Sequence, residues 1–307
     1  MKKLKTLLFG AGPGAGFFID NNLLEREFVG LLDNDEAKVG KSFFSLPVYS
    51  PKSLVDIDFD EIVITTQWAM AVKSQLTEEF NLPENKIVLP AKNQLKIERP
   101  FYNDNSAELA RCIIKGLNKL ATLEKTPLVI DFGTLLGLVR DKDIIPWDDD
   151  VDFAAPQEYA AQVESIVKKF VADNPHVDWR IERVVDGNQL ATAILLKFTS
   201  ATDDLTCFTS SISFRRAQEG KSIHLPSMGM WYAPEHHFDS FETLEWKGEV
   251  IQVPFEYIEY LTFQYGDWNT PKKDIKLTDY AHLQEVGFDE IKSEKRILQN
   301  ITITNAT

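Results

Sequence analysis

Four aspartates lie within five positions of the segment Ile145–Phe153, which reads Ile-Pro-Trp-Asp-Asp-Asp-Val-Asp-Phe. Carboxylates this close repel one another strongly unless a cation lies between them. Hard oxygen ligands combined with phosphate chemistry suit Mg²⁺ or Mn²⁺. The segment therefore predicts a divalent-metal centre that handles a phosphorylated ligand.

The alternation within this segment indicates which carboxylates share a face. Aspartate is depleted in strands, yet Asp150 and Asp152 alternate with Val151 and Phe153. In a strand, the two apolar side chains point to one face and the two aspartates to the other. Asp148, just before, can lean toward the same side. A solvated acidic turn is the alternative interpretation, and the flanking apolar alternation argues against it.

A glycine and a threonine precede the aspartates by one helix and a turn. Gly133 lets the backbone approach a phosphate, and the helix that begins near Thr134 offers free N–H groups to it. Arg140 and Lys142 are near enough in sequence to supply positive charge to a leaving phosphate.

These residues together resemble the LicD family of phosphotransferases, which includes fukutin-related protein and has a nucleotidyltransferase-like fold. The shared pattern is an Asp, then Gly-Ser/Thr-Leu-Leu-Gly, an Arg, and Ile-Pro-Trp-Asp-x-Asp-Val/Ile-Asp, which this chain carries between Asp131 and Asp152. A second match is Tyr260–Pro271, similar to the family's late Tyr-Gly-Asp-Trp-x-x-Pro motif.

The resemblance implies transfer of phosphocholine or a polyol phosphate from a CDP-linked donor to a glycan or lipid-linked saccharide, with CMP leaving. By position, the catalytic and metal-binding acids are Asp148, Asp150 and Asp152. Mg²⁺ (or Mn²⁺) on these carboxylates would neutralise charge on the leaving CMP, and Asp148 is the candidate base for the acceptor hydroxyl.

The resemblance also implies a set of donor-binding residues around these acids. Gly133 and Thr134 would hold the donor phosphate, and Asp131 and Arg140 would line the site. Asp149 occupies a position that the family varies, and we expect a lesser role for it.

One later segment departs from the family pattern. Many members carry an Asp-Ile-Phe-Pro-like stretch, and the nearest segment here is Thr202–Phe208. Asp203 or Asp204 could supply a third acidic ligand, or both could lie in a solvated turn.

A glycine-rich loop lies near the start of the chain, after the apolar segment Leu4–Phe9. It contains Gly10, Gly12 and Gly14, and Asp33 ends the next apolar segment, 21 residues after Gly12. Loop amides can bind a diphosphate and the acid a ribose hydroxyl, so these four residues are candidates for a nucleotide or nucleotide-sugar site. A tight turn that binds no ligand is the alternative.

The N-terminal region also resembles the short Rossmann-like domain of bacterial polysaccharide-biosynthesis enzymes and sugar N-acetyltransferases, on Phe28–Asp35 and Leu46–Tyr49. An oxidoreductase or nucleotide-sugar modifying enzyme that uses this domain is therefore a competing function. A non-catalytic glycan-assembly protein is a third.

Strands and helices alternate over the first ~95 residues, which predicts a parallel sheet. The polar segment Ile97–Ser106 is a plausible linker. We therefore expect an α/β chain with a Rossmann-like parallel-sheet domain (1–97) and an α+β nucleotidyltransferase-like domain (98–307). Further predicted elements are helices at 69–80, 106–125, 134–140, 158–173 and after Pro254, and strands at 128–131, 149–154, 194–199 and 206–214.

Composition narrows the partners. The formal net charge of −14 over 307 residues disfavours nucleic acid as a ligand. No apolar stretch reaches the ~20 residues that span a bilayer, so we expect a cytoplasmic protein that meets the inner face of the membrane through its acceptor. The two cysteines form no Cys-x-x-Cys motif, and the five histidines show no metal-helix spacing.

Overall fold

The computed structural model describes residues 3–96, 99–199, 204–280 and 282–303. It divides into two compact units, which are residues 1–97, 272–281 and 285–293, and residues 98–271, 282–284 and 294–307. Segments 272–281 and 285–293 thus group with the first unit, although the sequence analysis placed them in the second domain. The boundary residues Ile97 and Glu98 lie outside the described part of the chain.

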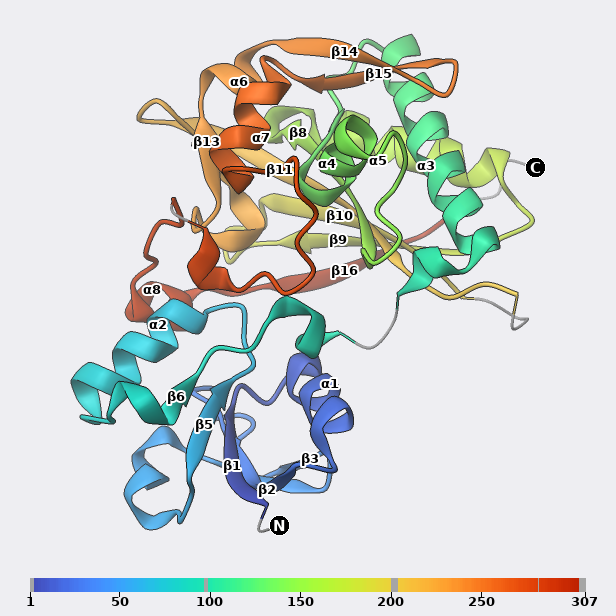
Figure 1. Ribbon diagram of the computed structural model, residues 1–307. Coiled ribbons are helices and arrows are strands. Elements are labelled where there is room, and N and C mark those ends of the chain that lie inside the picture. Colours follow the sequence, from blue (N-terminus) through green and yellow to red (C-terminus); the bar gives the residue numbers. More distant parts are fainter. Residues whose placement is uncertain (1–2, 97–98, 200–203, 281, 304–307) are drawn as a thin grey trace. The chain divides into compact units, whose positions relative to one another are not determined.

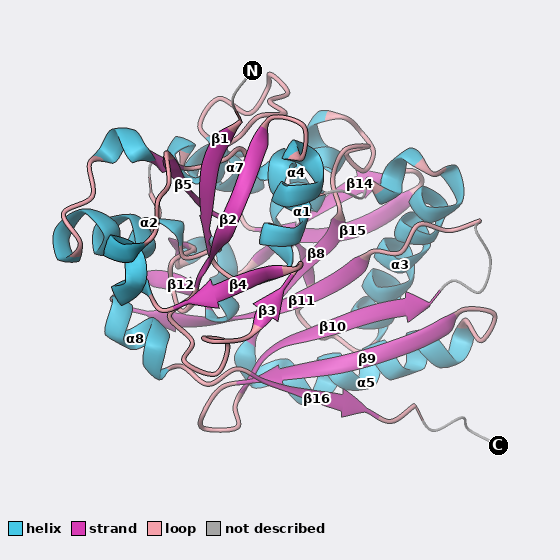
Figure 2. Cartoon of the chain, turned by 90° about the horizontal axis from the view of Figure 1, so that it is seen from below, coloured by secondary structure: helices cyan, strands magenta, loops and turns pink. Residues whose placement is uncertain are grey.

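A six-stranded sheet forms the centre of the first unit, in the order β3-β4-β2-β1-β5-β6 (Figures 1 and 2). All neighbouring strands are parallel except β3 and β4. The strands are β1 (Leu4–Phe9), β2 (Arg26–Leu32), β3 (Ser42–Phe43), β4 (Leu46–Tyr49), β5 (Glu61–Ile64) and β6 (Ile87–Val88).

Apolar residues fill both faces of this sheet, as expected for parallel strands. Helix α1 (Pro13–Asn22) packs with Leu8 of β1 on one face. Helix α2 (Ala69–Ser74) packs with Leu7 on the other, and a π-helical turn, Gln75–Glu79, completes the predicted helix 69–80. A short helix, α8 (Phe288–Ser293), belongs to the same unit.

The second unit is built on an eight-stranded mixed sheet. Its main path runs β13-β12-β11-β10-β9-β16, and β8 pairs in parallel with β11 and antiparallel with β7 (Figure 2). The strands are β7 (Val129–Ile130), β8 (Asp150–Pro156), β9 (Asp178–Val185), β10 (Ala191–Thr199), β11 (Thr209–Gln218), β12 (Lys221–His224), β13 (Tyr232–Pro234) and β16 (Ile297–Ile301).

Five helices and a hairpin complete the second unit. They are α3 (Asp104–Leu123), α4 (Phe132–Arg140), α5 (Ala160–Asp173), α6 (His236–Asp239), α7 (Tyr257–Tyr265), and the strands β14 (Phe241–Trp246) and β15 (Glu249–Pro254). A Cβ atom at Gly116 would lie 2.5 Å from the Phe170 ring, so this glycine is what lets α3 approach α5 so closely.

A buried asparagine joins α3 to the hairpin. The Asn118 side chain is 6% exposed, donates to the Val250 carbonyl at 2.8 Å and accepts from the Gln252 N–H at 2.8 Å. Both hydrogen bonds go to the backbone of β15, so they set the position of that strand against the helix.

These elements confirm the predicted fold class, an α/β chain with a parallel sheet in its N-terminal part. Helix α3 begins at Asp104, two residues before the predicted start, and is capped by the Asn103 side chain, which accepts from the Ser106 N–H. The strands β3, β4, β9 and β12 to β16 and the helices α6 and α8 were not predicted. All of these except β9 are only two to six residues long, whereas β9 alternates polar and apolar residues at its start and was missed.

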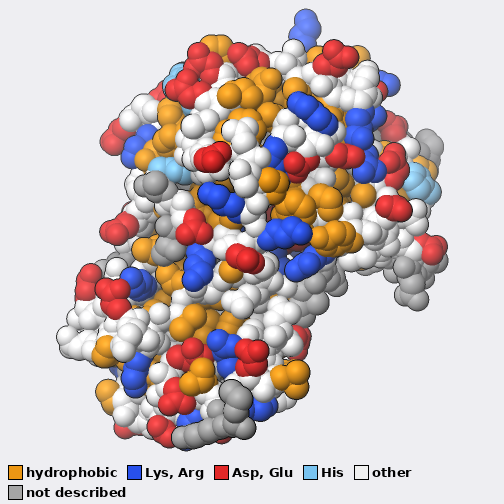
Figure 3. All heavy atoms as spheres, viewed as in Figure 1, with side chains coloured by type: hydrophobic (Ala, Val, Ile, Leu, Met, Phe, Trp, Pro, Cys, Tyr) orange, Lys and Arg blue, Asp and Glu red, His pale blue; other side chains and the backbone are white. Residues whose placement is uncertain are grey.

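Acidic and basic side chains are interspersed over the face shown in Figure 3. Within the residues that the structure describes, no helix has the length and apolar character that crossing a bilayer requires.

Replacing Asn118 with alanine should leave the Gln252 N–H and the Val250 carbonyl without their buried side-chain partner. We expect the free energy of unfolding to fall by about 1–3 kcal/mol, measured by equilibrium urea denaturation. The matched control is Lys119→Ala at the exposed neighbouring position, which should change it by less than about 0.5 kcal/mol. Equal stabilities of the two variants would contradict the role given to Asn118.

Candidate functional site

A buried ion pair lies beneath the candidate site. Asp131, at the end of β7, is fully buried and caps α4, with its Oδ1 accepting from the Phe132 N–H at 2.8 Å. Its Oδ2 accepts from Nη2 of Arg215 at 2.7 Å and from Nε at 3.2 Å. The Tyr260 hydroxyl donates to the same carboxylate. Asp131 therefore anchors α4, β11 and α7 to one another instead of lining a donor site as predicted.

The surroundings of Arg215 favour its charged form. The side chain is 2% exposed and lies over the rings of Phe132 and Phe238, at 5.4 and 4.1 Å. Burial alone would lower the pKa of Arg215, but the charge of Asp131, the charges of Tyr260 and Asp152 and the hydrogen bond to Asp131 together more than offset this and raise it. Burial, followed by the Asp131 charge, raises the pKa of Tyr260 well above its usual value. Arg215 thus stays protonated and Tyr260 keeps its proton as a donor.

Three aspartates converge where β8 begins. One carboxylate oxygen from each of Asp148, Asp149 and Asp150 lies within 4.8 Å of the other two, and all three side chains are partly buried. The predicted trio was Asp148, Asp150 and Asp152. The structure thus adds Asp149, for which we expected a lesser role, and places Asp152 outside this group.

Because Gly133 has no side chain, the Asp148 carboxylate can lie directly against it. A Cβ atom there would lie 2.3 Å from Oδ2 of Asp148, so any larger residue would displace that carboxylate. The aspartate therefore lies against the first turn of α4, where backbone N–H groups favour negative charge. Gly137, one turn later, allows the loop before β8 to pack closely, because a Cβ there would lie 2.7 Å from the Asp143 carbonyl oxygen.

Asp152 follows two residues along β8 and is held by two hydroxyls. Its N–H donates to Thr134 Oγ1 at 2.8 Å, and its Oδ1 accepts from Ser211 Oγ at 2.7 Å. Thr134 is 4% exposed and thus fixes the register of α4 against β8 instead of contacting a donor phosphate directly. Ser211 lies opposite Asp152 in the parallel pair β8–β11.

The electrostatic environment of Asp152 is strongly negative. Burial first, and then the charges of Asp148, Asp131 and Asp149, raise its pKa to about 7, although the Ser211 hydrogen bond acts in the opposite direction. The neighbouring carboxylates thus add to the effect of burial in favouring the protonated form of Asp152. Carboxylate oxygens crowded in this way match the ligand set that Mg²⁺ or Mn²⁺ takes.

The predicted donor-binding arginine is turned to other partners. Arg140 donates from Nε and Nη2 to Asp141, at 2.8 and 2.7 Å, and from Nη1 to the Trp268 carbonyl at 3.5 Å. Lys142 donates to the Val139 carbonyl at 2.9 Å. A phosphate would have to compete with Asp141 to reach Arg140.

Of the two candidates for a third acidic ligand, Asp203 lies outside the described residues. Asp204 is exposed in a turn, and its backbone carbonyl accepts from the Asn105 side chain at 3.2 Å. It does not belong to the group of converging carboxylates found among the described residues.

The candidate nucleotide site of the first unit is built as a tight turn. Gly10 has a φ of +112°, and a Cβ at Gly14 would lie 2.5 Å from the Thr65 carbonyl oxygen, so both positions need glycine. Gly12 precedes α1 and faces open space. Asp33 Oδ2 accepts from the Ala11 N–H at 2.8 Å. Asp33 therefore holds the loop in place.

Both carboxylate oxygens of Asp33 already accept further hydrogen bonds, which would compete with a ribose hydroxyl. Oδ2 also accepts from Lys38 Nζ at 3.0 Å, and Oδ1 accepts from the Asp35 N–H at 2.9 Å. The predicted contact with a ribose hydroxyl would have to displace Lys38.

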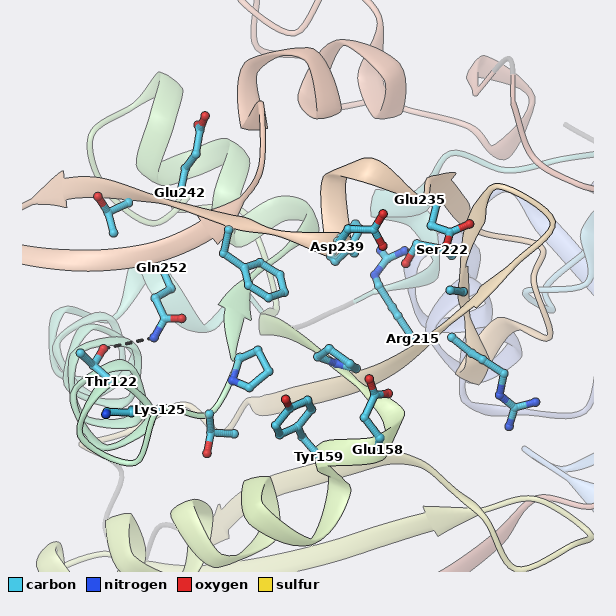
Figure 4. Close-up of a pocket in the computed structure, with 18 of the residues that line it drawn as sticks. Thr122, Lys125, Glu158, Tyr159, Arg215, Ser222, Glu235, Asp239, Glu242 and Gln252 are labelled. Carbon is cyan, nitrogen blue, oxygen red and sulfur yellow. Dashed lines mark hydrogen bonds between the residues drawn. The ribbon is translucent and has the colours of Figure 1, made fainter.

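A pocket of about 940 Å³ opens at the other end of β8 (Figure 4). It is lined by Pro156, the last residue of β8, and by residues from α3, β11, α6 and the hairpin, among them Thr122, Arg215, Asp239 and Gln252. Six residues of strand separate Asp150 from Pro156, a distance of about 20 Å. The pocket contains none of the predicted site residues, and we assign it no part in the chemistry at the aspartates.

Comparison with known proteins agrees with the resemblance drawn from the motifs. Residues 125–256 match the model of the LicD/FKTN/FKRP nucleotidyltransferase domain, a range that contains Asp131, Arg215 and all the aspartates of β8. The match ends before the Tyr260–Pro271 motif. No curated protein matches the chain.

Solved structures share parts of the architecture at low similarity. UDP-D-quinovosamine 4-dehydrogenase from Vibrio fischeri aligns over 26% of this chain and 73% of its own, with 21% identity and a TM-score of 0.23. The antibiotic-resistance enzyme ANT(2")-Ia, in complex with adenylyl-2"-tobramycin, aligns over 50% and 76%, with 16% identity and a TM-score of 0.29. Scores this low carry no argument about activity.

Removing Arg215 should destabilise the protein, because Asp131 would keep a buried charge without its partner. We expect Arg215→Met to lower the free energy of unfolding by about 3–5 kcal/mol in urea denaturation. Asp131→Asn combined with Arg215→Met should recover part of this loss. If Asp131→Asn lowers the stability of the Arg215→Met protein by as much as it lowers that of wild type, the pair is not coupled as described.

Asp152→Asn should stabilise the metal-free protein at pH 8. The pKa of Asp152 is about 7 in the folded protein and lower in the unfolded chain, so the stability of wild type falls as pH rises from about 4 to 7. The asparagine variant has no carboxyl group at this position and should not lose stability in this way. In EDTA at pH 8, we expect its melting temperature to exceed that of wild type by roughly 3–8 °C. The difference in melting temperature between Asp152→Asn and wild type should vanish below pH 4.

Two further measurements check the cause of this effect. The exposed control Asp204→Asn should melt like wild type at both pH values. Millimolar Mg²⁺ should raise the melting temperature of wild type more than that of Asp152→Asn. A variant that melts below wild type at pH 8 in EDTA would contradict the charge crowding.

Proposed function

We propose that the LicD-type domain transfers a phospho-alcohol, phosphocholine or a polyol phosphate, from a CDP-activated donor to a glycan hydroxyl, with CMP as the leaving group. The observation that carries this proposal is the convergence of Asp148, Asp149 and Asp150 at the start of β8, inside the residues that match the LicD/FKTN/FKRP nucleotidyltransferase domain. The family match itself indicates a transferase domain.

The donor set fits a hard divalent ion. Mg²⁺ prefers oxygen ligands at about 2.0–2.1 Å, and Asp148, Asp149 and Asp150 offer several carboxylate oxygens on one short segment. When bound, Mg²⁺ or Mn²⁺ would neutralise the charge that builds up on the donor diphosphate. Asp152, two residues further along the same face of β8, adds to the negative field that attracts the ion.

The remaining tasks fall to the chain itself. Gly133 leaves the space in which the Asp148 carboxylate lies against the start of α4. Thr134 and Ser211 hold Asp152 in place through its backbone N–H and its carboxylate. In this proposal Asp148 accepts the proton of the acceptor hydroxyl, so the attacking oxygen gains nucleophilic character as the bond to phosphorus forms.

Asp150→Asn should abolish transfer while leaving the fold intact. The assay follows CMP release from CDP-choline, CDP-glycerol and CDP-ribitol, each with Mg²⁺ and glycan acceptors, and we expect turnover with one donor class. Because the variant loses a carboxylate that would bind metal, its rate should fall at least about 100-fold, equivalent to ~2.7 kcal/mol of transition-state stabilisation.

The matched control is Asp204→Asn, an identical change at an exposed position, which should retain wild-type turnover. Circular dichroism confirms that both variants fold. Wild-type turnover by Asp150→Asn would contradict the catalytic role proposed for these aspartates. Absence of CMP release from all three donors would contradict the proposed reaction.

A further inference from the structure

We propose that His236, His237 and Glu259 bind one late first-row divalent ion, such as Zn²⁺, at a second metal site separate from the aspartates of β8. One ligand atom from each of these three residues lies within 4.8 Å of the other two. The two histidines come from α6 and the glutamate from the first turn of α7. This inference is independent of the proposed phosphotransfer.

The contacts of His237 prepare one of its nitrogens for a metal. The side chain is 0% exposed, and Nδ1 lies 2.8 Å from the Phe255 carbonyl oxygen. Because a carbonyl can only accept, Nδ1 carries the proton and Nε2 carries a lone pair. Metal-binding histidines commonly have their second nitrogen fixed in this way by a carbonyl or carboxylate.

The second nitrogen of His237 is buried and has no hydrogen-bond partner. Polar side-chain atoms buried in this way usually have a partner, so an unsatisfied lone pair points to a ligand that completes it. The neighbouring ring of His236 lies close, with 4.0 Å between the ring centroids. His237, with its unpartnered Nε2, thus belongs to the same cluster as the donor groups of His236 and Glu259.

The other two ligands can adjust to an ion. His236 and Glu259 are exposed, so their side chains have freedom that the buried His237 lacks. Ligands at Zn²⁺ distances of 2.0–2.2 Å in a tetrahedron lie about 3.4 Å apart, which requires only small side-chain movements from the observed separations. Three protein ligands would leave the fourth position to water.

The chemistry of this trio separates it from the aspartate centre. Imidazole nitrogens favour Zn²⁺ and its neighbours in the first transition row, whereas oxygen-only sites favour Mg²⁺ or Mn²⁺. A nitrogen-rich site and a carboxylate site in one domain therefore select different ions. Sequence spacing does not indicate the nitrogen-rich site, because adjacent histidines lack the spacing of metal-binding helices and Glu259 is 22 residues away from His237.

An ion here would connect α6 to α7 beside the buried ion pair. Phe238 of α6 lies over Arg215, and Tyr260 of α7 donates to Asp131. The His237 and Tyr260 rings are themselves 5.6 Å apart between centroids. Zn²⁺ would thus stabilise the two helices that cover the Asp131–Arg215 pair.

The test uses the untagged full-length protein, stripped of metal and then titrated with Zn²⁺. About 5–10 mM Mg²⁺ is present to occupy the carboxylate centre. The pH is roughly neutral, where histidine is largely uncharged and can bind a metal. We expect one equivalent of zinc to remain after dialysis, measured by atomic emission. Co²⁺ in its place should give the visible absorption bands of a four-coordinate nitrogen-containing site.

His236→Ala and Glu259→Gln should each weaken Zn²⁺ binding at least tenfold, about 1.4 kcal/mol, and reduce the Co²⁺ bands. Both changes are at exposed positions, so the variants should fold, which circular dichroism checks. The matched controls are His176→Ala, an exposed histidine elsewhere, and Asp150→Asn in the aspartate centre. Both should bind zinc like wild type.

Three outcomes would overturn the proposal. The first is the absence of retained zinc in the wild-type protein. The second is retained zinc that neither His236→Ala nor Glu259→Gln weakens. The third is weakening by Glu256→Gln with none by Glu259→Gln, because Glu256 lies 3.6 Å from His236 and would then be the ligand.

Discussion

The buried contact between Asp131 and Arg215 is the interaction on which the second unit depends. It joins the end of β7, the start of α4, the middle of β11 and, through the Tyr260 hydroxyl, helix α7. Removing two charges from water is costly, and here the carboxylate regains hydrogen bonds from a guanidinium, a phenol and a backbone amide. Because each partner comes from a different segment, the pair fixes the direction of α4 relative to the sheet. The position of every aspartate near β8 follows from that direction.

Crowded negative charge is the second physical constraint. Gly133 makes room for the Asp148 carboxylate, and the short connection into β8 brings Asp149 and Asp150 beside it. Burial, followed by the charges of the neighbouring aspartates, raises the pKa of Asp152 to about 7. Three carboxylates therefore converge at the start of β8, and Asp152 lies two residues further along the same strand.

Sequence reasoning located the cluster of carboxylates more readily than its supporting contacts. The period of two along Asp150–Phe153 was sufficient to place the aspartates on one face, because strand geometry leaves no alternative. Asp131 was assigned to the donor, since an aspartate that caps a helix and one that contacts a ligand look alike in a sequence. Arg215 was missed because a single arginine within a predicted strand carries no spacing signal for a partner 84 residues away. Asp33 was similarly predicted to bind ribose, whereas the structure shows it holding the glycine loop.

The order of segments along the chain has a consequence for biosynthesis. Asp131 leaves the ribosome well before Arg215, and Tyr260 follows Asp131 by 129 residues. The strand β9 likewise lacks its neighbour at the sheet edge until β16 has been made, because Ile181 pairs with Ile301. During translation the nascent second unit therefore holds an unpaired carboxylate and an open strand edge, the features that invite aggregation or chaperone binding. The first unit has its six strands within the first 88 residues, so its sheet can form while the rest of the polypeptide is still being made.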